Sequence, residues 1–355
     1  MKVLVVGAGP TGLTAALELA RNGVKPRIVE RRSAPSELSR AVGIMPETIE
    51  KLRPSGVGDA IVREAMPLRK VTVNRAETKL MSLDFTDTDL RDQTLLGLPQ
   101  TRTESLMRDA LAEMGVEVEF ECAVSEIETD NTEAVVTFSD GASDTYDWVI
   151  AADGLQSTIR EQLGIAYPGK DLPGKWSIAD VDLGGGYDPE QFTAWIQQGD
   201  SGAFTFIIPI EKKRLRIVSS TDDAIGSLPV TLDIQKVRRT AIFEISVRQA
   251  ETYQRGRVLL AGDAAHCHSP VGGKGMNLGI DDAVSAANAI LTSTTEQYTQ
   301  NRHSVGKGVL KKSESARKIV SARNPIIKLA VTLVTFAIDR SALLQSGLMR
   351  NLTRL

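Results

Sequence analysis

The chain opens with an apolar run, three closely spaced glycines and a helix-forming segment, and this order limits what its N-terminus can fold into. Residues 2–6 are almost entirely apolar and β-rich, which is typical of a strand buried on both faces of a parallel sheet. Residues 12–22 favour a helix that stops at Asn22 and Gly23, and residues 25–32 return to a strand. The sequence therefore predicts a strand–helix–strand unit.

The glycines at the first turn of this unit, in the stretch GAGPTG at 7–12, match the needs of a bound dinucleotide. Gly7 permits a tight turn, Gly9 lets the backbone approach a pyrophosphate, and Gly12 lets the helix pack closely on the strand. The phosphate then lies at the helix N-terminus, where free N–H groups meet it. Glu30 ends the second strand, where its carboxylate can accept hydrogen bonds from a ribose hydroxyl. We therefore predict a dinucleotide here rather than a coincidental glycine turn.

A second segment, at 256–283, helps to decide which dinucleotide binds. NAD and FAD share the first unit, and Arg31 or Arg32 is even compatible with a 2′-phosphate. The second segment has Asp263 directly after an apolar strand, followed by a glycine-rich loop that leads into a helix. A domain that binds only NAD has no use for such a loop so far along the chain, whereas the ribityl chain and ring of FAD extend well beyond the pyrophosphate. This difference favours FAD.

Segments of the nucleotide-binding type recur at 146–154 and 256–266, where a buried strand ends in an acidic and glycine-containing turn. Residues 70–85 and 174–220 instead alternate apolar and polar side chains, which predicts an antiparallel sheet. Two interleaved domains explain this order, and the predicted fold class is α/β. We assign an FAD-binding domain to 1–69, 99–173 and 252–300, a mixed or antiparallel substrate-binding sheet domain to 70–98 and 174–251, and a C-terminal helical segment to 301–355.

The composition narrows the partners. The net charge of −3 and the pI near 5.8 offer no basic footprint for a nucleic-acid backbone, so no nucleic-acid partner is predicted. Cys122 and Cys267 lie far apart and form no CxxC pair, which fits a reducing, cytoplasmic setting. His266 and His268 form a possible metal pair, but no third ligand accompanies them, so no metal site is predicted.

The C-terminal part contains one strongly apolar run, residues 325–338, which includes Lys328. The run is shorter than the roughly 20 residues that a membrane-spanning helix needs, so no transmembrane segment is predicted. We expect a buried helix here, with a membrane-surface contact as the alternative. The basic residues that precede the run are expected on a solvated helix face; they are Lys307, Lys311, Lys312, Arg317 and Lys318.

Three motifs in order resemble those of the class A flavoprotein monooxygenases with the para-hydroxybenzoate hydroxylase fold. They are GAGPTG at 7–12 with Glu30, DGLQSTIR at 153–160, and GDAAHCHSPVGGKGMN at 262–277. Weaker matches are Arg40, in SRAVGI, and Gln100, in LPQTRTESLMRDAL. The resemblance extends over nearly the whole chain and implies a Rossmann-like FAD-binding domain interleaved with a substrate sheet.

The resemblance also implies roles for single residues. Asp263 would bind a ribityl hydroxyl, with Gln100 and Arg40 acting along the ribityl and phosphate region, and Asp153 and Arg160 would hold the pyrophosphate side and help to admit a nicotinamide nucleotide. The amides of Gly275, Met276 and Asn277 would face the flavin pyrimidine, where the helix dipole stabilises the reduced, anionic flavin. The flavin-facing loop is expected to comprise Pro270, Gly272, Gly273, Gly275, Met276 and Asn277, without a named catalytic residue. The remaining predicted cofactor contacts are Pro10, Thr11, Arg31, Val124, Gly154 and Gly262.

The activity that the resemblance implies is hydroxylation of an aromatic or polyketide-like small molecule. NADPH or NADH, bound transiently, would reduce FAD, and O₂ would form a C4a-hydroperoxide that delivers one oxygen atom. Candidate substrate-lining segments are WSIADVDL, FTAWIQQ and FTFIIPI, with Pro209 and Pro270 near the ring. Two alternatives stay open: a reductase of the same fold acting on an alkene or isoprenoid, and a non-enzymatic flavin-binding regulator.

Overall fold

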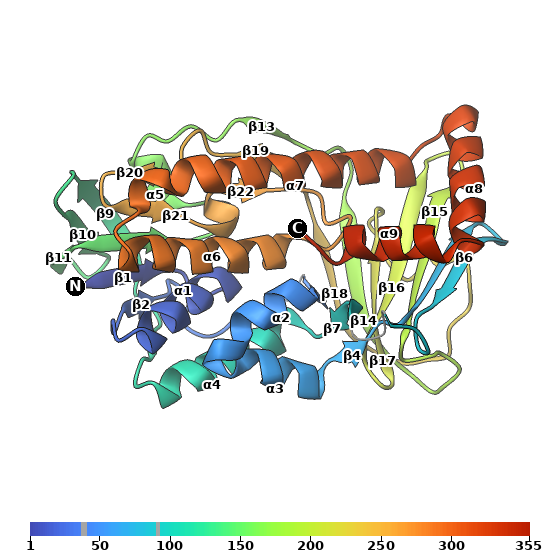
Figure 1. Ribbon diagram of the computed structural model, residues 1–355, viewed down its shortest axis with the longest axis horizontal. Coiled ribbons are helices and arrows are strands. Elements are labelled where there is room, and N and C mark those ends of the chain that lie inside the picture. The colour runs from blue at the N-terminus through green and yellow to red at the C-terminus, as the bar shows by residue number, and fades with distance from the viewer. Residues whose placement is uncertain (37–40, 90–92) are drawn as a thin grey trace.

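The computed structural model describes residues 1–36, 41–89 and 93–355 (Figure 1). Figure 1 shows an elongated molecule with one sheet region at each end and the long helix α7 (Tyr298–Val320) running along both. The N-terminus lies at one end of the molecule, and the C-terminus lies near its middle. Arg40, which was predicted to contact the cofactor, lies outside the described residues.

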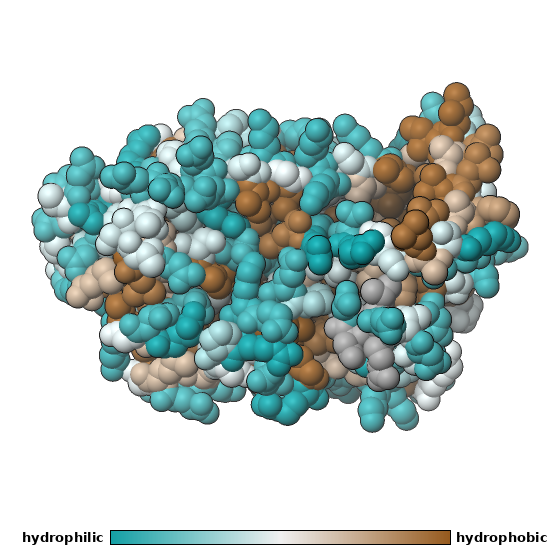
Figure 2. Space-filling view, viewed as in Figure 1, coloured by the Kyte–Doolittle hydropathy of each residue, from teal (hydrophilic) through white to brown (hydrophobic). Residues whose placement is uncertain are grey.

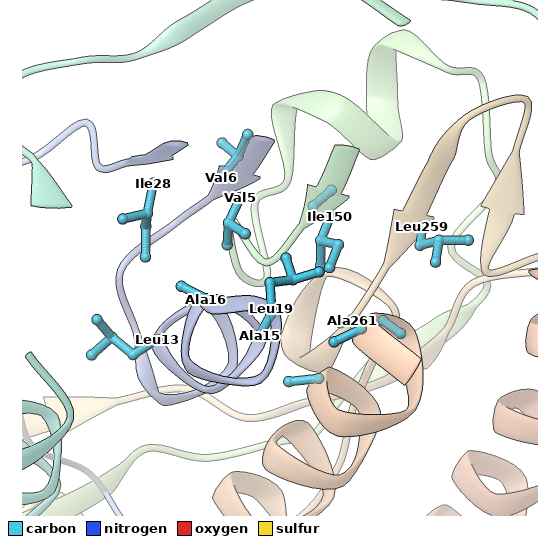
Figure 3. Packing of buried hydrophobic residues seen from close by; sticks show 14 of the residues in the cluster. Val5, Val6, Leu13, Ala15, Ala16, Leu19, Ile28, Ile150, Leu259 and Ala261 are labelled. Atoms are coloured by element: carbon cyan, nitrogen blue, oxygen red, sulfur yellow. The ribbon is translucent and has the colours of Figure 1, made fainter. Parts of the chain in front are cut away.

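The first region is built on a six-stranded sheet whose strands are parallel except for β20. Its order is β20 (Gln254–Arg255), β21 (Val258–Leu260), β12 (Trp148–Ala151), β1 (Val3–Val6), β2 (Arg27–Val29) and β8 (Val118–Glu119). Helix α1 (Pro10–Arg21) follows β1 and packs against α6 (Gly275–Leu291). Figure 3 shows Val5 and Ile150 of the sheet meeting Ala15 and Leu19 of α1. The predicted strand–helix–strand unit is therefore present.

The second region is a seven-stranded sheet. Its order is β18 (Ile234–Phe243), β14 (Trp176–Leu183), β17 (Arg214–Ser219), β16 (Ala203–Glu211), β15 (Gln191–Gln198), β5 (Lys70–Arg75) and β6 (Thr78–Asp84). All neighbours are antiparallel except β15 and β5, which are parallel. That single parallel pair joins the two segments, 70–98 and 174–251, that the sequence assigned to one inserted domain.

Three small sheets and several short helices connect the two regions. The sheets are β3 (Gly43–Ile44) with β7 (Leu96–Gly97) and β4 (Met66–Pro67); β11 (Ser143–Tyr146) with β10 (Ala134–Phe138) and β9 (Val124–Thr129); and β13 (Gly169–Asp171) with β19 (Ser246–Gln249) and β22 (His266–Cys267). The helices are α2 (Pro46–Leu52), α3 (Val57–Glu64), α4 (Gln100–Glu113) and α5 (Thr158–Gln162), with 3₁₀ turns at Arg53–Ser55, Gly262–Ala264 and Thr295–Gln297. Strand β7 falls inside the predicted insertion 70–98 but pairs with β3 and β4 of the first region. The sequence segment therefore returns to the first region before residue 98.

The C-terminal segment is helical, with α8 (Pro325–Asp339) and α9 (Ala342–Leu352) after α7. The expectation of a buried helix at 325–338 is wrong, because Thr335 is the one buried residue of α8. Among the described residues, no single helix is long and apolar enough to cross a membrane. Two consecutive helical segments are together long and apolar enough, namely Thr295–Val320 and Pro325–Asp339, but they are bent by 104° relative to each other.

Candidate functional site

In the turn after β1, neighbouring backbone atoms lie so close to two of the glycines that neither position can carry a side chain. Gly7 has a φ of +102°, and a Cβ on it would lie 2.3 Å from the carbonyl oxygen of Ala152. A Cβ on Gly12 would lie 1.8 Å from the carbonyl oxygen of Gly7. These two glycines therefore allow β1, the start of α1 and the end of β12 to approach one another.

Gly9 behaves differently from its two neighbours. It is the N-cap of α1, with an extended backbone, and a Cβ on it would meet no atom within 4 Å. Pro10 occupies the first helical position, where its missing N–H costs nothing. The fold itself thus leaves the space beside Gly9 open, which fits the predicted approach of a pyrophosphate to this helix N-terminus.

Glu30 lies directly after β2, and its side chain is buried beside the glycine turn. Its carboxylate accepts a hydrogen bond from the Ala8 amide at 3.0 Å and from the Nε of Arg32 at 3.0 Å. Burial alone would raise the pKa of Glu30, but these hydrogen bonds outweigh it and lower the pKa. Glu30 is therefore a fixed anion next to the turn. Arg31, by contrast, is exposed.

The DGLQSTIR motif begins where β12 ends, next to Gly7. Asp153 accepts a hydrogen bond from the Ile159 amide at 3.2 Å through one carboxylate oxygen, whereas its other oxygen, Oδ1, is buried without a partner. Burial raises the pKa of Asp153 despite its hydrogen bonds. Gly154 has a φ of +85°, and Ser157 caps α5 by accepting a hydrogen bond from the Arg160 amide. The unpartnered Oδ1 leaves an acceptor for a ligand beside the glycine turn.

Arg160 joins the second motif to the third. Its side chain is buried and donates hydrogen bonds to the carbonyl oxygens of Ala264 and Leu155, both at 3.0 Å. Its guanidinium also lies over the ring of Tyr167, 3.9 Å from the ring centre. Its direct part in binding a pyrophosphate stays a prediction.

The GD turn of the third motif packs against the first motif through Thr11. A Cβ on Gly262 would lie 2.5 Å from the Thr11 hydroxyl, and a Cβ on Gly279 would lie 2.4 Å from the same atom. Asp263 is exposed at this turn, as a contact to a bound ribityl chain requires, and its carbonyl accepts a hydrogen bond from the Tyr167 hydroxyl at 2.9 Å. All three motifs therefore meet around the start of α1.

A buried charge cluster supports the GD turn, and sequence reasoning did not predict it. Asp282 of α6 accepts hydrogen bonds from the Gly262 amide at 3.1 Å, from His266 at 2.5 Å and from the Nε of Arg302 at 2.7 Å. Burial alone would raise the pKa of Asp282, but His266 and Arg302 outweigh it and lower the pKa. Asp282 follows the motif in sequence, but nothing there revealed that Arg302 would reach it from α7.

The predicted flavin-facing loop has two consecutive glycines in the left-handed backbone conformation and then enters α6. Gly272 and Gly273 have φ values of +96° and +62°, a conformation that favours glycine. Within α6, the Leu278 amide donates to the carbonyl of Lys274, so the amides of Gly275, Met276 and Asn277 precede the hydrogen-bond ladder of the helix. These are the amides that were predicted to face the flavin.

The side chain of Asn277 is used within the protein. Its amide oxygen accepts hydrogen bonds from the Met45 amide at 2.9 Å and the Thr48 hydroxyl at 2.8 Å, and its Nδ2 donates to the carbonyls of Gly43 and Gly273, both at 2.9 Å. Asn277 thus ties the loop to the segment before α2, and its backbone N–H is what is left for a cofactor.

His268 is the unexpected member of this loop. Its Nδ1 pairs with the carbonyl oxygen of Ser269 at 2.8 Å, and its Nε2 is buried without a partner. Burial lowers the pKa of His268 to about 4, so the ring is neutral at neutral pH and Nε2 is a bare acceptor. A Cβ on Gly275 would lie 3.9 Å from this nitrogen. The sequence had suggested a possible metal pair with His266, for which no third ligand was found.

The other predicted contacts lie at the edges of this site. Gln100 begins α4, accepts a hydrogen bond from the Ala41 amide at 3.2 Å and donates one to Glu104 at 2.8 Å. It therefore holds the residue that follows Arg40. Val124 begins β9 and packs half-buried against the main core, and Pro270 is also half-buried. Their contacts to a cofactor stay predictions.

The cysteines and histidines of this region do not form a common cluster among the described residues. Burial raises the pKa of Cys267 to about 11 and also raises that of Cys122, so both thiols are protonated at neutral pH. Within residues 1–36, 41–89 and 93–355, no group of three or more His, Cys, Asp or Glu side chains could hold a metal ion. His266 faces Asp282, whereas His268 faces a backbone carbonyl.

The seven-stranded sheet packs an aromatic face against the loop and against helix α7. Trp176, Phe204 and Phe206 stack in succession, with ring centres 4.8 Å and 5.2 Å apart. Val271 of the loop belongs to the same packed cluster. Aromatic residues form only 5% of the chain, but several gather on this face; the others are Phe192 and Phe243.

A buried ion pair holds the same sheet against the first region. Arg216 is fully buried and donates to both carboxylate oxygens of Asp180, at 2.7 Å each. Its other terminal nitrogen donates to the carbonyl of Ala41 at 3.3 Å. Pro209 touches the small sheet, because a Cβ on Gly97 would lie 2.4 Å from the Pro209 carbonyl. Both contacts were beyond sequence reasoning, because they join distant segments.

These residues fit FAD. The glycine turn leaves room where a Cβ would fill it, α1 and α6 both direct their N-termini into loops of the shared motifs, and the buried Oδ1 of Asp153 is an acceptor without a partner. Two helix N-termini suit a ligand with a pyrophosphate at one end and an electron-rich ring at the other.

Comparison with known proteins supports this assignment. The family model described as an FAD binding domain matches residues 1–313. Among similar proteins, 6-methylpretetramide 4-monooxygenase of Streptomyces rimosus is 31% identical, over 93% of this chain and 64% of its own length. Pentachlorophenol 4-monooxygenase of Sphingobium chlorophenolicum is 32% identical, over 79% of this chain and 56% of its own length. The chain thus spans roughly two thirds or less of these two relatives.

Solved structures agree in fold. The anhydrotetracycline hydroxylase of Streptomyces rimosus superposes with a TM-score of 0.77 and 28% identity, covering 99% of this chain and 76% of that one. The p-nitrophenol 4-monooxygenase of Pseudomonas putida has a TM-score of 0.86 and 24% identity, covering 99% and 98%. The predicted α/β fold of the para-hydroxybenzoate hydroxylase type is thereby confirmed. By its family match and by its relatives, the chain belongs to the FAD-binding domain family that includes the flavin-dependent aromatic and polyketide monooxygenases.

Proposed function

We propose that this protein is an FAD- and NAD(P)H-dependent monooxygenase that hydroxylates an aromatic or polyketide-like small molecule. The observation that carries the proposal is the meeting of three distant motifs around the start of α1, through the contacts of Gly7, Thr11 and Arg160. The similarity to monooxygenases of tetracycline and chlorophenol type adds to it.

Bound FAD supplies the redox chemistry, namely uptake of a hydride from NADPH or NADH and transfer of one atom of O₂ to the substrate while the other leaves as water. The chain supplies position and electrostatics. The N-terminus of α6 carries unpaired amides and a positive dipole end, which would stabilise the charge that grows on the reduced ring. The peroxide route that the resemblance implies stays a prediction.

We propose that the substrate lies beside the aromatic face of the seven-stranded sheet, where Phe206 is half-buried. Trp176, Phe204 and Phe206 lie on strands β14 and β16, and Val271 brings the flavin-facing loop into the same cluster. A planar, apolar ligand held there lies against rings that favour offset or edge-to-face stacking. The bare Nε2 of His268 lies beside Gly275 at the start of α6 and would accept a hydroxyl proton of a ligand that reached it.

A separate pocket of about 360 Å³ suits the transient nicotinamide nucleotide. Arg160 and Arg248 both line it, together with the ring of Tyr167. Arg248 pairs with Asp171 at 2.9 Å and could exchange this partner for a phosphate of the nucleotide. Arg160 connects the pocket wall to the GD turn through the carbonyl of Ala264. We propose this pocket as the approach of the reductant, which has no second glycine-rich nucleotide motif in the sequence.

The experiment that tests the proposal is anaerobic stopped-flow reduction of the purified protein. Mass spectrometry of the released cofactor is expected to show FAD, and a phenol, anthraquinone or tetracycline-like ligand is expected to accelerate FAD reduction by NADPH or NADH. Rapid reduction of FAD together with saturation of an alkene ligand would establish the reductase instead. FAD that no nicotinamide nucleotide reduces, under any ligand, would indicate the regulator. FMN or NAD in place of FAD would end the proposal.

A further inference from the structure

Helix α8 exposes an unusually uniform apolar face. All of its exposed residues are apolar, and the large ones are Ile326, Ile327, Leu329, Leu333, Val334 and Phe336, which we call the α8 face. Four of them, Ile326, Leu329, Leu333 and Val334, have exposed fractions of 58–75%. Figure 2 shows this apolar surface at the upper right, over α8 of Figure 1. Contiguous apolar surface of this kind marks a binding site.

The polar residues of α8 hold it in this orientation. Arg75 of β5 donates hydrogen bonds to the Thr332 hydroxyl at 2.9 Å and to the Lys328 carbonyl at 3.0 Å. Asp339 accepts a hydrogen bond from the Ser82 amide of β6 at 2.8 Å. The polar stripe of the helix is thus turned toward the sheet hairpin, and its apolar stripe is turned outward. This reverses the usual arrangement of a surface helix, which buries its apolar stripe.

Positive charge is concentrated in the C-terminal segment that carries the α8 face. Seven Lys or Arg residues and one acidic residue, Asp339, lie between Ser315 and Leu355, a net charge of +6 in a chain whose net charge is −3. Arg323 lies just before α8 and Arg340 just after it, both exposed, and the guanidinium of Arg340 lies 3.6 Å from the ring centre of Phe336. Cations at both ends of an apolar helix can remain in the headgroup layer while the apolar side chains enter the acyl boundary.

This charge separates the candidate occupants of the face. A second copy docked by the same face would bring a second charge of +6 against the first, which opposes association. An anionic surface instead gains from every Lys and Arg near it. A lipid bilayer also accepts the exposed isoleucine, leucine and phenylalanine side chains without a shaped groove.

We propose that the α8 face docks this protein on an anionic lipid bilayer, with α8 lying in the interface and the cations of Arg323 and Arg340 among the headgroups. The inference does not rest on the proposed reaction. Docking on a bilayer also gives a reason why the apolar stripe of α8 faces outward. The hydrogen bonds of α8 to β5 and β6 hold this orientation but do not explain it.

Vesicle co-sedimentation of the whole chain tests the proposal. Vesicles of phosphatidylcholine alone are compared with vesicles of equal parts phosphatidylcholine and phosphatidylglycerol. We expect at least about tenfold stronger partition onto the anionic vesicles at low salt, most of which is lost when NaCl rises from about 0.1 M to about 0.5 M.

Two double variants separate the apolar and the charged contributions. Leu329→Asn with Leu333→Asn is expected to lower partition at least tenfold. Arg323→Gln with Arg340→Gln is expected to lower it about fivefold per charge. The matched controls change exposed residues elsewhere, Val62→Asn with Ile242→Asn and Lys212→Gln with Lys213→Gln, and are expected to stay within about twofold of the unchanged protein. Circular dichroism confirms that each variant is folded.

Equal partition onto neutral and anionic vesicles overturns the proposal, and so does partition that neither α8 variant lowers. Sedimentation velocity provides the other outcome. If the protein does not bind vesicles but forms a dimer, and the Leu329 and Leu333 substitutions dissociate that dimer, then a second copy covers the α8 face. Both results leave FAD binding and hydroxylation untouched, so they are distinguishable from a failure of the proposed function.

Discussion

The two sheets of this molecule specify their ligands by different means. In the six-stranded sheet, short buried strands end in turns where glycine is required, and in the proposed site backbone amides and helix N-termini contact the cofactor. In the seven-stranded sheet, longer strands present side chains, and recognition depends on which aromatic or charged groups share a face. Backbone recognition restricts the residue type and leaves a motif, whereas side-chain recognition does not.

The largest expected effect lies in the glycine turn, where matched substitutions separate folding from cofactor binding. Gly12→Ala places a Cβ 1.8 Å from the Gly7 carbonyl, so we expect a loss of more than about 4 kcal/mol in the free energy of unfolding of the FAD-free protein. Gly9→Ala meets no atom, so stability should be nearly unchanged while FAD affinity falls about tenfold or more. Urea unfolding and FAD titration measure the two effects. Unchanged FAD affinity in the Gly9 variant would remove this turn from the cofactor site.

In the seven-stranded sheet, the largest loss of stability should come from breaking its buried ion pair. Arg216→Met leaves the buried carboxylate of Asp180 without its bidentate partner, and we expect a loss of about 3–5 kcal/mol in the free energy of unfolding. The double variant Arg216→Met with Asp180→Leu should recover most of it, because no unpaired charge is left. The exposed pair of Arg102 and Glu64 is the control, and Arg102→Met should cost less than about 1 kcal/mol. Equal losses at both pairs would contradict the account.

Asp263 tests a predicted cofactor contact that is made by an exposed side chain. Asp263→Ala should weaken FAD binding by roughly 1–3 kcal/mol, the value of a charge-assisted hydrogen bond. Asp263→Asn keeps a hydrogen-bond acceptor, so its FAD affinity should lie between those of the unchanged protein and Asp263→Ala. Fluorescence titration of the FAD-free proteins gives the affinities. Identical affinities across the series would exclude Asp263 from the site.

The smallest expected effect is the pH dependence contributed by His268. Its pKa is about 4 in the folded protein and near the ordinary 6.5 when unfolded, so the unfolded chain takes up a proton first as the pH falls. Stability is therefore lost between about pH 6.5 and pH 4, by about 1–2 kcal/mol after allowance for partial solvent contact.

The variant His268→Asn, which keeps a donor toward the Ser269 carbonyl, should flatten this slope, and His303→Asn should leave it unchanged. Urea unfolding at several pH values gives the two slopes. A wild-type slope that persists in the His268 variant would show that other groups cause it.

The contrast between the sheets also decides how much the sequence could predict. The strand–helix–strand unit, the three motifs and the fold followed from glycine spacing and strand patterns, because those features are local. The Asp282 cluster and the Arg216 contact to Ala41 could not follow, because each joins segments far apart in the chain. The buried helix expected at 325–338 was wrong because most apolar residues there face outward. Hydrogen bonds to Arg75 and Ser82, which join distant segments, help to hold the helix in that orientation.

The most direct test of the central claim is the fate of molecular oxygen. Purified FAD-loaded protein is incubated with NADPH or NADH, ¹⁸O₂ and the phenol or polyketide-like ligand that most accelerates FAD reduction, and the product is analysed by mass spectrometry. The account predicts a product that carries one ¹⁸O atom from O₂ and none from labelled water. A product without ¹⁸O, formed while the nicotinamide nucleotide is consumed, would contradict it.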